Sequence, residues 1–175
     1  MRALALALGA LVLAGCVTPS PEAVIPTLVV TSSAFAADAA IPRVYTCQGA
    51  NTSPALRIAN LTANTTALAL ILDDPDAPNG GFTHWIFWNL PASQADLPAS
   101  VDVAGRGGVE GNNGGGSLGY RGPCPPSGTH HYHFRAYGLD RPLSLAKGST
   151  VVELRDAMAG HVVARGELVG TYAKS

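Results

Sequence analysis

The pattern of hydrophobic positions predicts a chain built mainly of β-strands. Residues 67–73 are almost entirely apolar, as in a strand that is buried on both faces. Other runs that are β-branched, apolar or aromatic also indicate strands, at residues 27–31, 55–58, 83–90, 130–139 and 168–172. A long loop at residues 105–122, in which nine of the eighteen residues are glycine, separates two of these runs. Loops of this length in compact domains are usually functional or mobile.

One helix is predicted near the C-terminus. Thr150 and Glu153 have the spacing of a capping box, which satisfies the first free N–H groups of a helix. The apolar residues that follow recur every four positions and form one stripe, at Leu154, Met158 and Val162. Gly166 stands where a C-terminal cap is expected. The pattern therefore predicts a helix between Thr150 and Gly166, within a fold that is mainly β with one or two helices.

The first residues have the pattern of a secretory signal. Arg2 precedes an apolar run at residues 3–13, which would extend roughly 16 Å as a helix and is too short to span a bilayer. The run ends in Leu13-Ala14-Gly15-Cys16, which resembles a bacterial lipobox. In that motif the signal is cut before the cysteine, and the cysteine then carries the lipid. The competing interpretation is an ordinary signal peptide with an incidental cysteine.

These features divide the chain into three parts. We expect a lipoprotein signal peptide at residues 1–15, a lipidated Cys16 within a proline-rich tether at residues 16–26, and one folded domain at residues 27–175. The protein would then be exported and anchored in a membrane through Cys16, facing the periplasm or the cell exterior.

Composition narrows the functional classes. The 175 residues carry a formal net charge of -1, and only 13% of them are charged. This balance excludes a strongly basic nucleic-acid-binding protein, and we expect no nucleic-acid partner.

Two cysteines remain once Cys16 is assigned to the lipid. An exported chain meets an oxidising compartment, where Cys47 and Cys124 tend to form a disulfide. The alternative is a pair of buried free thiols, and the sequence leaves both open.

An acidic turn follows the most apolar run. Its sequence is Asp73-Asp74-Pro75-Asp76-Ala77-Pro78, and the two prolines restrict the backbone. Carboxylates on a rigid rim are already in place when a ligand arrives, which favours recognition. The competing interpretation is a polar turn whose aspartates accept hydrogen bonds from nearby N–H groups.

Strand alternation predicts the direction of the aromatic and histidine side chains. In the first aromatic run it places His84, Ile86 and Trp88 on one face, and Trp85 and Phe87 on the other. In the second it places His130, Tyr132 and Phe134 on one face, and His131 and His133 on the other. The set with His130 and Tyr132 suits a small pocket. A zinc site is a weaker interpretation because no further ligand lies nearby at the required spacing, so we expect no metal and no cofactor.

Taken together, the segments resemble the phosphatidylethanolamine-binding protein family, in its bacterial Raf-kinase-inhibitor-like branch. The N-terminal signature is represented by Ile41-Pro42, Tyr45-Thr46-Cys47-Gln48-Gly49 and Ser53-Pro54-Ala55-Leu56. The two pocket motifs are represented by Asp74-Pro75-Asp76-Ala77-Pro78 with His84-Trp85, and by Gly122-Pro123-Cys124-Pro125-Pro126 with His130-His131-Tyr132-His133-Phe134. The C-terminal pattern is represented by Gly160-His161 and Gly170-Thr171-Tyr172. The resemblance covers residues 28–173.

The resemblance implies a sandwich of two antiparallel β-sheets with one or two helices on the C-terminal side. It also implies a shallow pocket for phosphate-like groups and phospholipid headgroups. By motif position, that pocket is lined by Asp74, Asp76, His84, Gly122, Pro126, His130 and Tyr132. The histidines and the tyrosine can donate to phosphate oxygens, and the backbone near Gly122 can approach closely because glycine has no side chain. The Ala77–Pro78 bond is a candidate for the cis form.

The leading functional prediction is a lipid-anchored binding protein for a small anionic or phospholipid-headgroup ligand. It is not expected to be an enzyme. The first alternative is an inhibitor or interaction protein that contacts a protein target through surface loops, residues 105–122 above all. A weak phosphoester hydrolase that uses His84, His130 and Asp74 is the second alternative.

Overall fold

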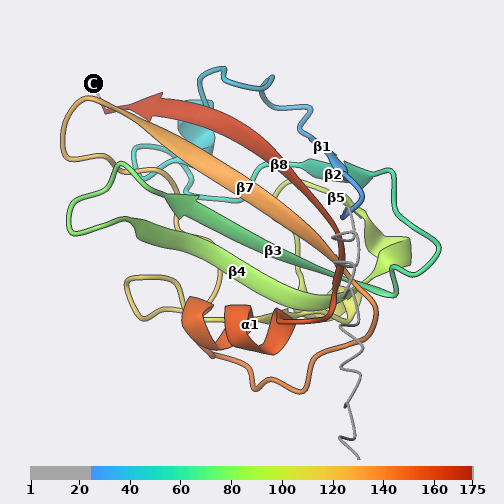
Figure 1. The fold of residues 1–175 in the computed structure, drawn as a ribbon. Helices are drawn as coiled ribbons and strands as arrows, with labels where there is room; N and C mark the ends of the chain where they lie inside the picture. The colour runs from blue at the N-terminus through green and yellow to red at the C-terminus, as the bar shows by residue number, and fades with distance from the viewer. Residues whose placement is uncertain (1–24, 175) are drawn as a thin grey trace, which may run out of the picture.

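The computed structural model describes residues 25–174 (Figure 1). The predicted signal peptide, Cys16 and the tether as far as residue 24 lie outside the described residues. Within residues 25–174, no helix is both long enough and apolar enough to cross a membrane.

A five-stranded antiparallel sheet forms the centre of the domain, with the strand order β6-β4-β3-β7-β8. Its strands are β3 (Ala67–Asp74), β4 (Phe82–Pro91), β6 (Val109–Glu110), β7 (Thr129–Leu139) and β8 (Val162–Ala173). The apolar run at residues 67–73 forms the middle strand, and six of its seven residues are buried, as predicted. Because both faces of β3 are covered, the strand carries no alternation of polar and apolar residues.

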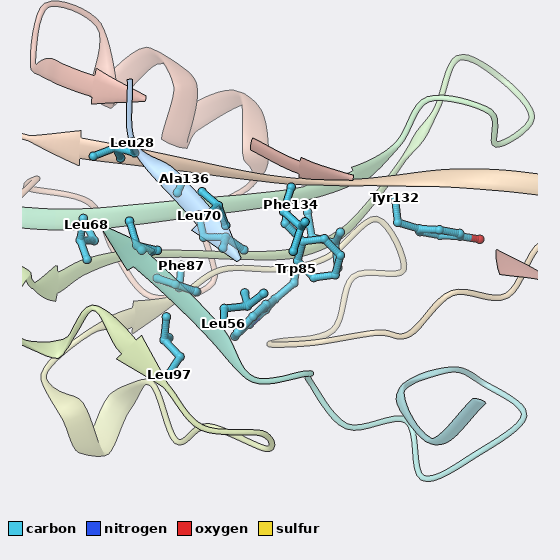
Figure 2. Packing of buried hydrophobic residues seen from close by; sticks show 14 of the residues in the cluster. Leu28, Leu56, Leu68, Leu70, Trp85, Phe87, Leu97, Tyr132, Phe134 and Ala136 are labelled. Atoms are coloured by element: carbon cyan, nitrogen blue, oxygen red, sulfur yellow. The ribbon is translucent and has the colours of Figure 1, made fainter. Parts of the chain in front are cut away.

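A three-stranded antiparallel sheet lies on one side of the large sheet, with the order β1-β2-β5. It consists of β1 (Val29–Thr31), β2 (Leu56–Ala59) and β5 (Asp96–Leu97), and three short 3₁₀ helices lie in the connections, η1 (Arg43–Tyr45), η2 (Ala92–Gln94) and η3 (Ala104–Arg106). Figure 2 shows the core between the two sheets, where Leu56 and Leu97 face Leu70, Phe87 and Trp85. Helix α1 (Val151–Met158) covers the other side of the large sheet through Leu154 and Met158. The predicted mainly β sandwich with one or two C-terminal-side helices is confirmed, and residues 25–174 contain one α-helix.

The predicted helix is about half as long as expected. The capping box of Thr150 and Glu153 is present, but α1 ends at Met158. Gly160 follows with φ 77°, a left-handed conformation that ends helices and that glycine adopts without steric cost. Val162 then begins β8, so the extension of the helix toward Gly166 was wrong. Val162 still packs against the same apolar cluster as Met158, which explains why the stripe continued in the sequence.

Gly166 serves strand packing rather than a helix cap. It lies inside β8, and a Cβ atom there would come within 2.3 Å of the carbonyl oxygen of Leu28. This close approach lets the N-terminal segment run beside β8, where the N–H of Leu28 donates to the carbonyl of Arg165. Because Gly166 has no side chain, the N-terminal segment at Leu28 can lie directly against β8.

Candidate functional site

A pocket of about 260 Å³ opens at one end of the large sheet, where β3 ends and β4 and β7 begin. Its wall comes from these three strands, from the turn that joins β3 to β4, and from the segment before β7. The lining residues are Asp74, Ala77, Pro78, Asn79, Phe82, His84, Arg121, Cys124, Pro125, Pro126 and His130. Four of the seven residues predicted from the sequence therefore lie together here, namely Asp74, His84, Pro126 and His130.

Asp74 lines the pocket and is 2% exposed. One of its oxygens, Oδ1, accepts a hydrogen bond from the backbone N–H of Asp76 at 2.9 Å. The other, Oδ2, accepts a hydrogen bond from Nδ1 of His130 at 2.7 Å and lies 4.0 Å from Nε2 of His84. The carboxylate thus serves both as a cap for its own turn and as the partner of the pocket histidines.

His84 reaches the pocket because β4 contains a β-bulge. Leu72 pairs with Trp85 and Asp73 pairs with Thr83, so His84 is the extra residue between them. A bulge breaks the strict alternation of side chains and redirects the residue that it contains. The expected shared face of His84 with Ile86 and Trp88 was therefore wrong, since those two side chains pack on the helix side. His84 instead contacts the edge of Tyr132, with ring centroids 5.2 Å apart.

The predicted alternation in β7 is confirmed. His130 and Tyr132 lie on the pocket side, whereas His131 and His133 face outward and bind the carboxylates of Asp76 and Glu167. The tyrosine ring continues the row of core side chains in Figure 2, and its hydroxyl points away from them. This hydroxyl is fully buried and has no hydrogen-bond partner among the described residues. Burial and the nearby Asp74 carboxylate raise the pKa of the Tyr132 phenol, so it remains a donor at neutral pH.

The hydrogen-bond partners of the two histidines fix which ring nitrogen carries the proton. Nδ1 of His84 lies 2.7 Å from the carbonyl oxygen of Arg121, which can only accept, so Nδ1–H donates to it. Nδ1 of His130 donates to the Asp74 carboxylate in the same way. When neutral, each imidazole therefore carries no proton on Nε2. Burial lowers the pKa of His84, against a smaller raising effect of the Arg121 carbonyl, which favours this neutral form.

Arg121 forms part of the rim and was not among the predicted site residues. Its guanidinium lies 5.4 Å from the ring centre of Phe82, which also lines the pocket. The arginine immediately precedes Gly122 in the second pocket motif, and this adjacency was the signal available in the sequence. A guanidinium on the rim supplies the fixed fork of donors that matches a phosphate or carboxylate group.

The segment around Gly122 is held against η1 and the loop that follows it. The N–H of Gly122 donates to the Asn51 side chain at 2.7 Å, and a Cβ atom at Gly122 would lie 2.4 Å from the carbonyl oxygen of Tyr45. Gly122 therefore permits this close packing, and its N–H is directed at Asn51 rather than into the pocket.

A disulfide joins Cys47 to Cys124 at a Cα–Cα distance of 5.4 Å, which is the first of the two alternatives that the sequence left open. It lies in the same contact as Gly122, because the N–H of Cys47 also donates to the carbonyl of Pro123. We call residues 121–126 the pocket lip, and the disulfide fastens this lip to the η1 region.

Two further expectations differ from the structure. Asp76 lies outside the pocket lining, because its Oδ2 accepts from the backbone N–H and from Nδ1 of His131, at 2.8 and 2.7 Å. These bonds lower the pKa of the exposed Asp76 carboxyl. The bond between Ala77 and Pro78 is trans, since residues 25–174 contain no cis peptide. Within the same residues, no cluster of three or more His, Cys, Asp or Glu side chains is placed to hold a metal ion.

A family model described as phosphatidylethanolamine-binding protein matches residues 31–173. The chain belongs to this family. A UPF0098 protein of Pyrococcus abyssi is 46% identical over 154 residues, which cover 84% of this chain and 86% of that protein. A Mycobacterium tuberculosis protein that is named as a lipoprotein, LppC, is 40% identical over 157 residues, covering 89% of this chain and 76% of that protein.

Two solved members of the family have the same fold. The phosphatidylethanolamine-binding protein homologue CT736 from Chlamydia trachomatis is 39% identical with a TM-score of 0.81, and the match covers 85% of this chain and 99% of that chain. YbcL from E. coli, titled a new member of the mammalian family, is 28% identical with a TM-score of 0.79 and the same coverage.

Proposed function

We propose that this chain is a lipid-anchored, extracytoplasmic binding protein that takes a small anion or a phosphate-bearing headgroup in the pocket at the end of β3. The observation that carries the proposal is the buried Asp74–His130 pair with His84 beside it, beneath a rim that holds Arg121. Membership of the family supports a binding role, and the resemblance to a relative named as a lipoprotein supports the anchor. The lipobox sequence at residues 13–16 agrees with both.

The size and the charges of the pocket favour a small ligand that carries both signs of charge. A volume of about 260 Å³ is below the range of pockets for drug-sized molecules. Arg121 offers donors to a phosphate group, and the Asp74 carboxylate offers an acceptor to an ammonium group. The buried Tyr132 hydroxyl still lacks a partner, and a ligand oxygen that reached it would remove the cost of leaving it unpaired.

Calorimetric titration with phosphoethanolamine and with inorganic phosphate tests the proposal. We expect saturable binding of both to the unlipidated chain of residues 17–175. His84→Ala is expected to weaken each affinity roughly 10- to 100-fold, because it removes a hydrogen bond to a charged group in a buried site. Arg121→Ala is expected to have an effect in the same range.

His161→Ala is the matched control, because His161 also pairs with an aspartate but lies at the turn between α1 and β8. It should leave both affinities unchanged. Absence of binding by the folded parent chain would overturn the proposal and direct the search to protein targets of the loop at residues 105–122.

We also propose that the pocket binds its ligand without chemical turnover. Among the described residues that line it there is no serine or threonine, and the sulfur of Cys124 is held in the disulfide. The same titration with a phosphate monoester, followed by assay for released phosphate, tests this point. Sustained release that His130→Ala abolishes would favour the hydrolase alternative.

The affinity for an anion should rise as the pH falls. Burial lowers the pKa of His84, so the ligand-free pocket holds it neutral with a bare Nε2 that cannot donate. An anion beside Nε2 raises this pKa and binds together with a proton, which favours the complex at lower pH. The charged or titratable groups that face His84 are Asp74, His130, Arg121 and Tyr132.

Sulfate is the suitable probe for this effect, because its charge stays constant over the range tested. We expect its affinity to increase between about pH 8 and pH 6, by at most about tenfold per pH unit for each proton taken up. His84→Gln should make the dependence shallower. An affinity that is constant over this range in the parent chain would contradict the proton-coupled mode of binding.

A further inference from the structure

A second concave surface lies away from the pocket, on the outer face of β7 and β8 beside α1. It is a groove of about 450 Å³, lined by Thr27, Arg135, Tyr137, Arg155, Arg165, Gly166 and Glu167. The strand pairing places Tyr137 opposite Arg165 and Arg135 opposite Glu167. We call this surface the arginine groove.

Two of its three arginines have no counter-ion among residues 25–174. Arg135 is bound by the Asp73 carboxylate and by Glu167, at 2.8 Å in the second case, and Glu167 is also held by His133. The side chains of Arg155 and Arg165 are exposed and form no ion pair or hydrogen bond with any residue of 25–174. The one acidic residue that lines the groove, Glu167, is therefore already engaged, whereas the guanidiniums of Arg155 and Arg165 have no such partner among residues 25–174.

The chain enters the folded domain at this same groove. The backbone N–H of Arg165 donates to the carbonyl of Pro26 at 3.0 Å, and Thr27 forms part of the groove wall. Only nine residues lie between Cys16 and Pro26, which makes ten Cα–Cα steps. Covalent geometry limits their reach to roughly 36 Å, so a lipid on Cys16 would keep the arginine groove close to the membrane surface.

We infer that the arginine groove is a docking surface for the phosphate-bearing headgroups of the membrane in which Cys16 is anchored. This inference rests on the anchoring that forms part of the proposed function. Each free arginine near an anionic surface should strengthen the contact about fivefold. The tether adds to this, because it converts docking into an intramolecular step with a high effective concentration of headgroups.

Docking at this groove decides which way the binding pocket faces. Tyr137 in the groove and His130 in the pocket lie seven residues apart on β7, a separation of roughly 23 Å, and on opposite faces of the strand. In Figure 1 the end of the sheet with the C-terminus lies on the left and the entry into β1 lies on the right. The docked domain would therefore present its pocket away from the anchoring membrane, toward ligands in solution or on another surface.

Vesicle sedimentation of the unlipidated chain of residues 17–175 tests the docking surface. The probe is phosphatidylcholine vesicles with and without phosphatidylglycerol. We expect binding that requires the anionic lipid, and the double variant Arg155→Gln/Arg165→Gln should reduce the partition coefficient about 25-fold. The control Arg43→Gln/Arg57→Gln removes the same charge from η1 and β2, where both arginines are exposed, and should change it far less.

Orientation is measured on the chain of residues 16–175 coupled through the Cys16 thiol to a maleimide lipid in nanodiscs. Cys16 is then the one free thiol, because the other two cysteines form the disulfide. With a nitroxide on the lipid headgroups, amide signals of α1 and of residues 165–167 should broaden most, and those of the pocket lip least. Broadening centred on the lip, or an equal loss of partition in both double variants, would overturn the inference.

Two further measurements distinguish docking at the arginine groove from ligand binding in the pocket and from binding of a soluble anion in the groove. Sulfate titration of Arg155→Gln/Arg165→Gln should match the parent chain, because these residues lie outside the pocket. A parent chain that docks but binds no sulfate or phosphoethanolamine would refute the proposed ligand function and leave the docking surface standing. Saturable binding of free sulfate at residues 165–167, without dependence of vesicle binding on these arginines, would instead identify a site for a soluble anion and overturn docking.

Discussion

The double variant Cys47→Ser/Cys124→Ser of the chain 17–175 is expected to unfold with a free energy about 4 kcal/mol below that of the parent. The disulfide closes a loop with a sequence separation of 77 residues, and opening it returns conformational freedom to the unfolded chain. Such a loss is a large fraction of the stability of a typical domain. Urea unfolding followed by fluorescence measures the difference directly.

The disulfide variant should also bind phosphoethanolamine more weakly, because the pocket lip loses one of its fastenings. The hydrogen bonds from Gly122 to Asn51 and from Cys47 to Pro123 remain available, so we expect a loss of less than about tenfold. Reduction of the parent chain should reproduce both effects, and the variant should not respond to the reductant. A thiol titration of the unreduced, denatured parent that finds two free thiols would refute the bond itself.

The second large effect is expected for His130→Ala, at about 3 kcal/mol of destabilisation near neutral pH. The substitution leaves the Asp74 carboxylate buried with the N–H of Asp76 as its remaining hydrogen-bond donor. Removing the donor that is hydrogen-bonded to a buried carboxylate is strongly destabilising, because the carboxylate stays desolvated without that partner. The measurement is again the free energy of unfolding, with circular dichroism to show that the variant is folded before it is titrated.

The double variant Asp74→Asn/His130→Ala separates the buried charge from the lost packing. Because the asparagine carries no charge, this variant should be more stable than His130→Ala alone. His131→Ala is the matched control, since the His131–Asp76 pair lies on the exposed face of the same strand and should contribute less than about 1 kcal/mol. Equal effects of His130→Ala and His131→Ala would show that the pocket pair has no special role in stability.

Much of the framework follows from local patterns in the sequence. The apolar run of β3, the alternation along β7 and the capping box of α1 each depend on residues that are close in the chain. Such patterns depend on the repeat of the backbone itself, so they survive in the folded structure with little change. The motifs that carry the family resemblance likewise placed Asp74, Pro126 and His130 correctly around one pocket.

Other features were decided by contacts between distant segments. The direction of His84 depends on a bulge, and the bulge depends on how β4 aligns with β3, which no local pattern in β4 contains. The end of α1 was hidden because Val162 continues the apolar stripe while already lying in a strand. The arginine groove exists because β7, β8, α1 and the N-terminal segment meet there.

Composition and short-range periodicity thus predict the β-rich class, the two cysteines available for a disulfide and the residue types of the pocket. The folded structure brings His84 and His130 together, holds the Nδ1 of each against a partner on another segment, and places Arg121 beside them at the rim. The physical reason is that register, bulges and close backbone approaches, such as the one at Gly166, arise from pairing between strands. Those pairings are selected by the whole core at once.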